Sequence, residues 1–190
     1  MPAKQFAAIV LTGISSALIA TAVHAASDDR GATGLVREVR EATADFRDPA
    51  AAVAAGYASL GSCVSGPQEG AMGVHFANGA LVGDGALDAS RPELVIYEQR
   101  GRQFRLLGVE YLVIAADWHA THPAPPVLMG QHFHYVGSPN RYGLPPFYEL
   151  HVWAWKNNPS GMFVDWNPNV SCEDYTAEEV APASTHSSHN

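Results

Sequence analysis

The chain has 190 residues, a formal net charge of −8 at pH 7, 47% hydrophobic residues and 16% charged residues. This hydrophobic fraction is enough for a packed core, and the length suits one domain better than two. The acidic balance excludes nucleic acid and anionic membrane surfaces as expected partners, because both repel a negatively charged chain.

Residues 1–25 have the pattern of a signal peptide that is removed on export. Lys4 is followed by an apolar stretch over residues 6–22, and Val23-His24-Ala25 is a small-x-small cleavage pattern. Without Lys4, 10 of the 11 basic residues remain against 19 acidic ones, a formal charge of −9. We expect a periplasmic or secreted protein that is not held in a membrane after cleavage. A retained anchor is the weaker alternative, because Gly13 and Ser15 interrupt the apolar stretch.

The domain, expected over residues 26–175, begins with a helical hairpin. Leu35, Val39 and Phe46 recur at helical spacing among charged residues, which predicts an amphipathic helix. Asp48-Pro49 then supplies an N-cap and a proline at the first helical position, so a short second helix is expected over residues 50–55.

From Tyr57 onward, short apolar runs separated by Gly, Pro, Asn and Asp predict strands joined by turns. The expected strands are Gly73–Ala77, Glu93–Gln99, Phe104–Ala115, Val127–Val136, Phe147–Lys156 and Met162–Asp165. Turn residues at 100–102 and 157–161 predict two hairpins. Few helices interrupt the strands, so the fold class is α+β, with the helical hairpin packed on a mainly antiparallel sheet that is open or barrel-like. Residues 176–190 contain few apolar side chains and are expected to form a disordered tail.

Both cysteines, Cys63 and Cys172, lie in the part of the chain that would be exported. An even cysteine count in an oxidising compartment favours a disulfide, and neither residue lies in a CxxC or nucleophile motif. We therefore expect Cys63 and Cys172 to be bonded to each other.

Two strand-like segments carry pairs of metal-ligand side chains two residues apart. His132 and His134 form one pair, and Glu149 and His151 form the other. Successive side chains of a strand point to opposite faces, so each pair shares a face, and pairing of the segments would bring four donors together. His75 is the best candidate for a further ligand. Imidazole and carboxylate donors suit a divalent transition metal such as zinc, copper or iron.

Other interpretations remain open for these residues. His132 and His134 can be an ordinary half-solvated pair, and Glu149 can form a buried ion pair with Arg105 or Arg141. Glu110 is a charged residue inside an apolar strand, and it is expected to act as a second-shell group, as a ligand or in a structural salt bridge. Residues 165–169 have the pattern of a turn with an aromatic anchor.

Two segments resemble a group of uncharacterised exported bacterial proteins. They are Gly70–Phe76, which contains a GxHF pattern, and Leu144–Lys156, which continues through an NPSG turn to Asp165-Trp166-Asn167-Pro168. The resemblance covers roughly residues 40–175 and implies no activity. His132-x-His134 is also partly similar to the first cupin motif, although the next acid, Glu149, comes much later than in cupins. What this similarity implies is a metal held by histidines and one glutamate on a β-scaffold.

Two functions are consistent with these patterns. The first is an exported metal-binding protein, which is an enzyme if a coordination position is open and a storage, carrier or sensor protein if the site is closed. The second is a metal-free module that binds a small molecule, apolar or sugar-like, in a pocket lined by Trp118, Trp153, Trp155 and Trp166.

Overall fold

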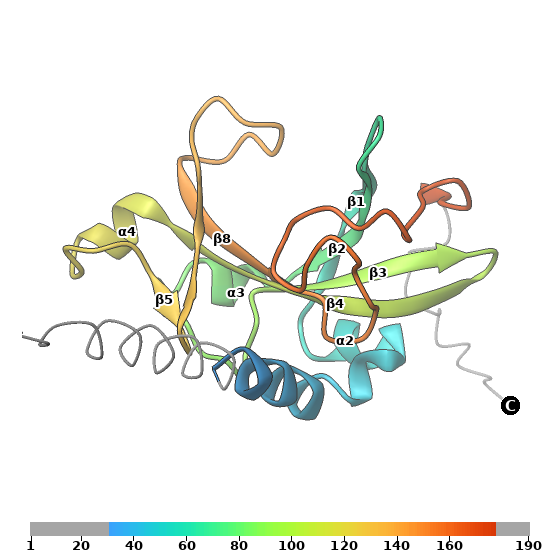
Figure 1. Ribbon diagram of the computed structural model, residues 1–190, viewed down its shortest axis with the longest axis horizontal. Coiled ribbons are helices and arrows are strands. Elements are labelled where there is room, and N and C mark those ends of the chain that lie inside the picture. Colours follow the sequence, from blue (N-terminus) through green and yellow to red (C-terminus); the bar gives the residue numbers. More distant parts are fainter. Residues whose placement is uncertain (1–30, 178–190) are drawn as a thin grey trace, which may run out of the picture.

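The computed structural model describes residues 31–177. The predicted signal peptide and most of the predicted tail lie outside these residues. Within them, none of the helices combines the length and the hydropathy that a membrane span requires. A helix over residues 31–42 comes first. The other elements, shown in Figure 1, are η1 (Asp45–Arg47), α2 (Pro49–Ala54), β1 (Ala58–Gly66), β2 (Gly70–Ala77), α3 (Gly79–Val82), β3 (Leu94–Arg100), β4 (Gln103–Ile114), α4 (Ala115–His119), β5 (Val127–Leu128), β6 (Gln131–His132), β7 (His134–Val136) and β8 (Phe147–Val152).

The predicted helical hairpin is confirmed, with an earlier end to its first helix. The helix over residues 31–42 buries Leu35 and Val39 against the sheet, and η1 follows in place of another helical turn. Asp48 caps α2 as expected, because its side chain accepts a hydrogen bond from the Ala50 N–H. These elements lie below the sheet in Figure 1.

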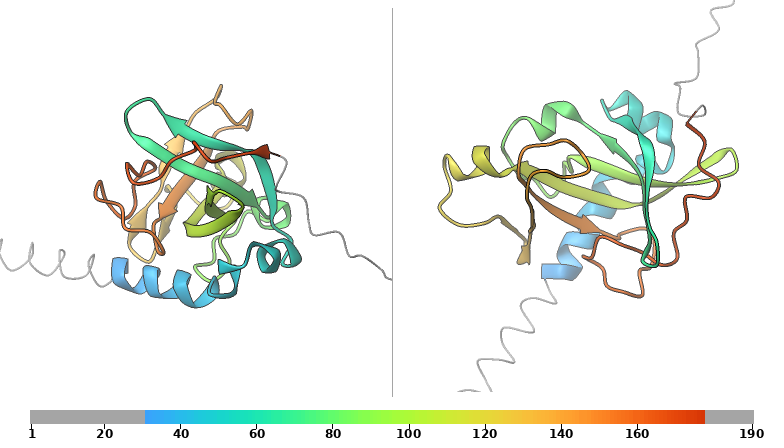
Figure 2. Two further views of the ribbon diagram at one scale, coloured as in Figure 1. Left: turned by 90° about the vertical axis from the view of Figure 1, so that its right-hand side faces the viewer. Right: turned by 90° about the horizontal axis from the view of Figure 1, so that it is seen from above.

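Six strands form a curled antiparallel sheet in the order β1-β2-β3-β4-β8-β7. The sheet curves as half of a barrel, with β1 and β7 at its two edges (Figure 2). The short strands β5 and β6 form a separate two-stranded sheet. The predicted fold class, α+β with a mainly antiparallel sheet that can approach a barrel, is therefore confirmed.

The two faces of the sheet bury different kinds of side chain. The face toward the 31–42 helix carries the main apolar core, which includes Val74, Tyr97, Tyr111 and Leu150. The opposite face carries two smaller apolar clusters, one around Trp153 and one around Phe147, Leu94 and Leu112. Successive side chains of a strand alternate between the two faces. A strand residue that precedes or follows a residue of the main core therefore points to the second face, toward the loops on that side.

The predicted strand Val127–Val136 is wrong as a continuous element. Met129 has a positive φ of 48° and Gly130 one of 85°, so the chain turns back there and pairs β5 with β6. The chain then joins the main sheet only from His134 onward, as β7. His132 and His134 consequently belong to different sheets and do not share a strand face.

The predicted strand Met162–Asp165 is also wrong, and the strand expected over Phe147–Lys156 ends earlier, at Val152. Regular pairing with β4 stops there, because the Ala154 N–H donates to the Val152 carbonyl and the N–H groups of Trp155 and Lys156 both donate to the carbonyl of Leu107 on β4. Residues 162–165 instead form a loop over the sheet, held by the Trp153 indole, which donates to the Val164 carbonyl at 2.6 Å. The expected turn exists, since the Gly161 N–H donates to the Asn158 carbonyl, but it does not connect two strands.

The predicted disulfide is confirmed between Cys63 on β1 and Cys172 near the end of the described chain, with their Cα atoms 5.7 Å apart. Strand β1 itself is not predicted from the sequence, because glycine and serine at 59, 61, 62, 65 and 66 have low strand propensity. The disulfide anchors this edge strand to the C-terminal segment.

Candidate metal centre

Three strands of the main sheet, β2, β4 and β8, place polar side chains on the face opposite to the 31–42 helix. Val74 and Phe76 on β2 enter the main core, so His75 between them points to the other face. Glu110 on β4 and His151 on β8 are paired across the two strands and share that face. Glu149 lies two residues before His151 and therefore points the same way.

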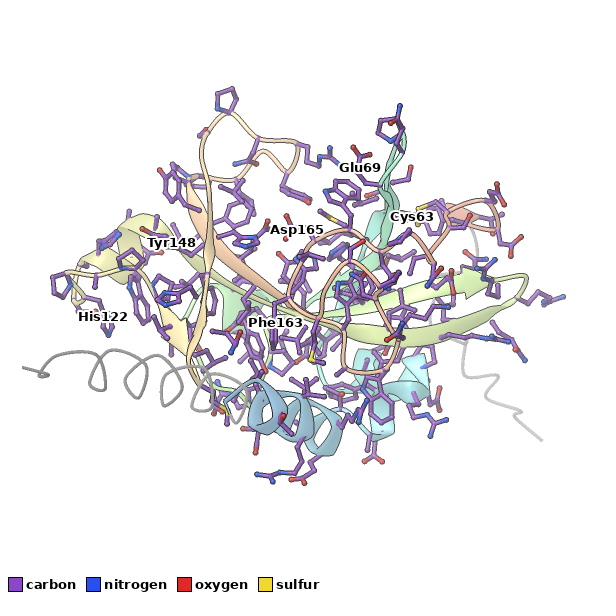
Figure 3. All side chains as sticks on the ribbon, viewed as in Figure 1. Cys63, Glu69, His122, Tyr148, Phe163 and Asp165 are labelled. Atoms are coloured by element: carbon purple, nitrogen blue, oxygen red, sulfur yellow. A yellow bond between two sulfur atoms is a disulfide. The ribbon has the colours of Figure 1, made fainter. Side chains whose placement is uncertain are left out.

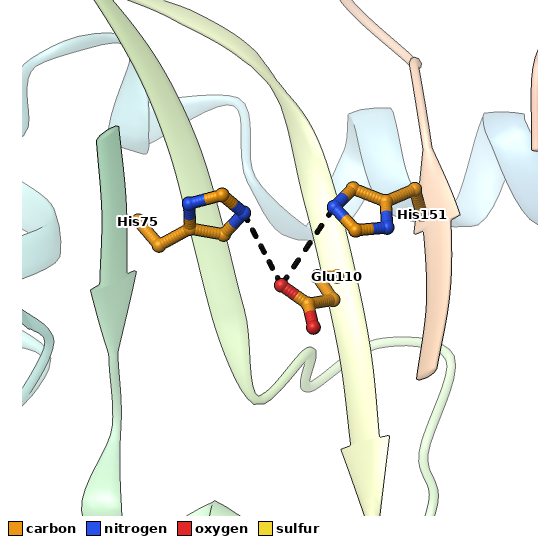
Figure 4. A group of neighbouring side chains, drawn as sticks. All are labelled: His75, Glu110 and His151. Atoms are coloured by element: carbon orange, nitrogen blue, oxygen red, sulfur yellow. Dashed lines mark ion pairs between the residues drawn. The ribbon is translucent and has the colours of Figure 1, made fainter. Parts of the chain in front are cut away.

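His75, Glu110 and His151 converge on one point, as Figure 4 shows. The Nε2 atom of His75 lies 3.3 Å from Glu110 Oε2, and the Nε2 atom of His151 lies 3.8 Å from the same oxygen. These distances exceed those of strong charge-assisted hydrogen bonds, roughly 2.7 to 2.9 Å. They match two donors on one cation, because ligands about 2.1 Å from a tetrahedral ion lie roughly 3.4 Å apart.

The other ring nitrogen of His151 faces a second group of side chains. Its Nδ1 atom lies 3.4 Å from Oδ1 of Asp165, and Nδ1 of His134 lies 3.3 Å from the same oxygen. Asp165 belongs to the loop after β8 and lies on the side of the sheet opposite to the 31–42 helix (Figure 3). Glu149, His151 and Asp165 thus form a second group able to hold a cation, which shares His151 with the first.

Burial leaves several donor atoms of this centre without a hydrogen-bond partner in the described protein. They are both ring nitrogens of His75, both ring nitrogens of His151, and Oε2 of Glu149. Only 3% of the His75 surface and 1% of the His151 surface are exposed. Buried polar atoms are normally paired, and leaving one unpaired costs roughly 1 to 3 kcal/mol. Five such atoms within one group therefore indicate a binding centre.

The two buried histidines differ in charge. Burial and, to a smaller extent, the neighbouring His151 lower the pKa of His75 to about 3, so its ring is neutral. Burial also opposes charge on His151, but the carboxyls of Glu110, Asp165 and Glu149 outweigh it and raise its pKa to about 9. A neutral imidazole is the form that binds a metal.

The carboxyls are shifted by the same two effects. Burial raises the pKa of Glu110 to about 8 and raises that of Glu149 as well, and the two side chains share a hydrogen bond. Burial of Asp165 acts in the same direction, but its contacts with His151 and His134 outweigh burial and lower its pKa. Burial therefore opposes ionisation of Glu110 and Glu149, whereas the histidine contacts favour the ionised form of Asp165.

A cavity of about 430 Å³ opens beside this centre. His75 and Glu110 line one part of it, and most of the remaining wall is aliphatic or aromatic, from β1, α3, the sheet and the loop over residues 137–146. Glu149 and His151 do not line it, so the cavity approaches the centre from the side of His75 and Glu110.

The structure brings together only some of the residues in the predicted site. His75, Glu149 and His151 lie in the centre. His134 lies at its edge, opposite Glu149 across β7 and β8 and 3.3 Å from Asp165, with 53% of its side chain exposed. His132 is exposed on β6, in the separate sheet, and is not part of the group. Glu110, expected as a second-shell group or a ligand, occupies the central position between the two histidines.

Asp165 is the residue that sequence reasoning missed. Within the turn predicted over residues 165–169, the Asn167 N–H donates to the Ala71 carbonyl, and this contact holds the segment that carries Asp165 over the sheet. A loop contact of this kind leaves no periodic signal in the sequence. The only usable signal is a lone acid between apolar neighbours in a segment that resembles the exported protein group.

Two alternative interpretations do not fit the geometry. The described residues contain no ion pair between Glu149 and either Arg105 or Arg141, and Arg141 instead lies over the Trp166 ring at 5.4 Å. The four tryptophans do not line one pocket. Trp118 and Trp155 pack against the main core, whereas Trp153 belongs to an apolar cluster on the opposite face.

A scan against protein-family models and searches of curated proteins and of solved structures find no match for this chain. The resemblances to the exported protein group and to cupins therefore stay predictions, and any functional assignment depends on the geometry of the centre.

Proposed function

We propose that this protein binds one divalent transition metal through Nε2 of His75, a carboxylate oxygen of Glu110 and Nε2 of His151. The observation that supports this most directly is the convergence of two buried, otherwise unpaired imidazoles on one carboxylate. A buried carboxylate that lacks a compensating cation is costly, and a metal ion meets this requirement for Glu110.

The remaining side chains suit supporting roles around such a site. Oδ1 of Asp165 lies 3.4 Å from Nδ1 of His151, where a carboxylate would fix the imidazole tautomer and direct Nε2 at the metal. Glu149 shares a hydrogen bond with Glu110 and serves as a further ligand on the side of His151 and Asp165. His134 holds Asp165 from the solvent side.

The donor set leaves zinc, copper and iron as candidates. Two histidines and one carboxylate bind catalytic zinc and non-haem iron, and histidine-rich sites also suit copper. Three protein ligands leave a coordination position open, and the cavity adjoins the same two residues, His75 and Glu110. A metal with an open position can activate bound water or polarise a substrate, so we favour an enzyme over a storage or carrier protein.

Export is part of the proposal. The disulfide between Cys63 and Cys172 is typical of proteins of oxidising compartments, which agrees with the signal-peptide pattern. A periplasmic or secreted protein would meet its metal outside the cytoplasm.

Elemental analysis of protein purified without a nickel column tests the assignment. We expect close to one zinc, copper or iron atom per chain in the wild type, and at least a tenfold loss in His75→Ala and in His151→Ala. His132→Ala and His122→Ala are matched controls, because both histidines are exposed and lie outside the centre, His122 near α4 (Figure 3). Circular dichroism of each variant confirms folding. A wild type without stoichiometric metal, or equal losses in all four variants, would show that the assignment is wrong.

A further inference from the structure

The wall of the cavity beside the centre is mostly apolar, and its charged groups are confined to a few positions. Leu94, Leu112 and Phe147 form much of its floor, and Leu60 and Val64 of β1 form one side. Apart from the Tyr142 phenol, its ionisable groups are His75 and Glu110 at the centre and Arg141 on the loop over residues 137–146. Its volume, about 430 Å³, falls in the range of small-molecule sites, roughly 300 to 1,000 Å³.

The apolar wall continues to the mouth of the cavity. Leu60 is 54% exposed, one of few large apolar side chains at the surface of the described residues, and it lines this cavity. It lies on β1, an edge strand of the main sheet, in the β1–β2 hairpin whose turn points upward in Figure 1. An exposed leucine that continues an apolar wall indicates that the body of the ligand is hydrocarbon.

The charges around the cavity favour an anionic head group on that ligand. A divalent ion held by two neutral imidazoles and the Glu110 carboxylate keeps one positive charge at the end of the cavity. Arg141 is the only lysine or arginine in the described lining, and it adds a second positive charge to the wall. The metal therefore supplies the positive charge at the end of the cavity that His75 and Glu110 line.

From these observations we infer that the open coordination position takes the carboxylate of a small acid with a hydrocarbon chain, the chain lying in the cavity. This inference rests on the proposed metal site and names the class of substrate that the site would receive. The carboxylate oxygen binds the metal at the His75–Glu110 end, and the chain extends along Leu94 and Leu112 toward Leu60.

Isothermal titration of zinc-loaded protein with octanoate tests the inference, with octanol and octylamine as neutral and cationic analogues of the same chain. We expect octanoate to bind at least tenfold more tightly than either analogue, and at least tenfold more tightly to zinc-loaded than to chelator-treated protein. Across hexanoate, heptanoate and octanoate the affinity should rise about fourfold per methylene, because each buried CH₂ leaves water. Equal affinity for octanol, or binding that survives zinc removal, would overturn the inference.

A cavity-filling variant separates this result from non-specific association. Ser62→Phe adds a ring to the β1 wall without touching the metal ligands, so octanoate affinity should fall at least tenfold while zinc content stays the same. Ser65→Phe is the matched control, since Ser65 is exposed on the same strand and does not line the cavity. Unchanged octanoate affinity in Ser62→Phe would place the ligand elsewhere and overturn the inference.

The two proposals fail differently in these measurements. A protein that takes up none of zinc, copper and iron defeats both the metal assignment and the inference that rests on it. A protein that takes up one zinc per chain but binds octanoate no better than octanol leaves the metal assignment intact and defeats only the substrate class.

Discussion

His75 and His151 show how neighbouring groups decide the chemistry of one residue type. Both rings are almost fully buried, but His75 faces a single carboxyl, whereas His151 has Glu110 on one side and Asp165 on the other. Burial controls the pKa of the first ring and the carboxylates control that of the second. The centre therefore contains one ring that is ready to bind a cation and one that must release a proton first.

Glu93 is another buried acid, and it is not part of the centre. Only 1% of its surface is exposed, its Oε2 accepts a hydrogen bond from the Leu112 N–H, and burial raises its pKa to about 8. A carboxyl whose pKa is raised by folding favours the folded state below its unfolded pKa, near 4.5, and this contribution is lost as the pH rises through about 8.

Glu93→Gln should therefore change the pH dependence of stability in one direction. Glutamine can keep the hydrogen bond to Leu112 and cannot ionise, so we expect the melting temperature to rise by several degrees at pH 9 and to change little at pH 5. Thermal unfolding followed by circular dichroism at both pH values measures this. Glu41→Gln on the exposed face of the 31–42 helix is the control, and an equal shift at both pH values would contradict the pKa of Glu93.

The pairing of β4 with β8 is the structural contact on which the centre depends most. Glu110 and His151 are directly opposed across these strands, one residue from the pair Val109 and Val152. A Cβ atom added at Gly108 would overlap the Val152 carbonyl, so glycine is what allows the two strands to approach closely here.

Gly108→Ala should accordingly separate the ligands. We expect a loss of stability of roughly 1 to 3 kcal/mol from the clash, together with lower metal content, because His151 moves with β8 away from Glu110. Denaturant unfolding and elemental analysis measure the two effects. Gly79→Ala is a suitable control, since a methyl group there meets open space. Full metal content in Gly108→Ala would show that the centre tolerates displacement of β8.

The sequence predicted those parts of the centre that depend on local periodicity. Glu149 and His151 alternate with core residues along β8, and His75 does so along β2, so their common face follows from the residues alone. The sequence does not place His132 correctly, because residues 127–136 have the pattern of one continuous strand. In the structure Met129 and Gly130 turn the chain within that segment. The central position of Glu110 does not follow from the sequence, because it depends on which strands become neighbours. Strand order is a property of tertiary packing.

At the scale of the whole molecule, one covalent bond connects distant parts of the fold. Cys63 and Cys172 are 109 residues apart in sequence, so their bond closes a loop through most of the described chain. It connects the edge strand β1, which forms one wall of the cavity, to the segment that follows the Asp165 loop. Loop closure restricts the unfolded chain and so favours folding.

Removing this bond should lower the free energy of unfolding by about 4 to 5 kcal/mol, the value of the chain-entropy relation for a loop of this size. Urea unfolding of Cys63→Ser/Cys172→Ser, compared with the wild type, gives the difference. Reductant should destabilise the wild type and leave the double variant unchanged. Thiol titration of the unfolded, non-reduced wild type should detect no free thiol, and two thiols per chain would contradict the bond.

The alternation of the two faces along β8 also has a consequence for how the chain folds. A shift of this strand by one residue would turn Glu149 and His151 into the apolar core between the sheet and the 31–42 helix. It would also turn Leu150 and Val152 to the opposite face of the sheet. Such a mispaired chain would bury two ionisable groups in hydrocarbon and is therefore strongly disfavoured. The residues that form the centre thus favour the correct register of β8 during folding, because only a sheet in that register can accommodate them.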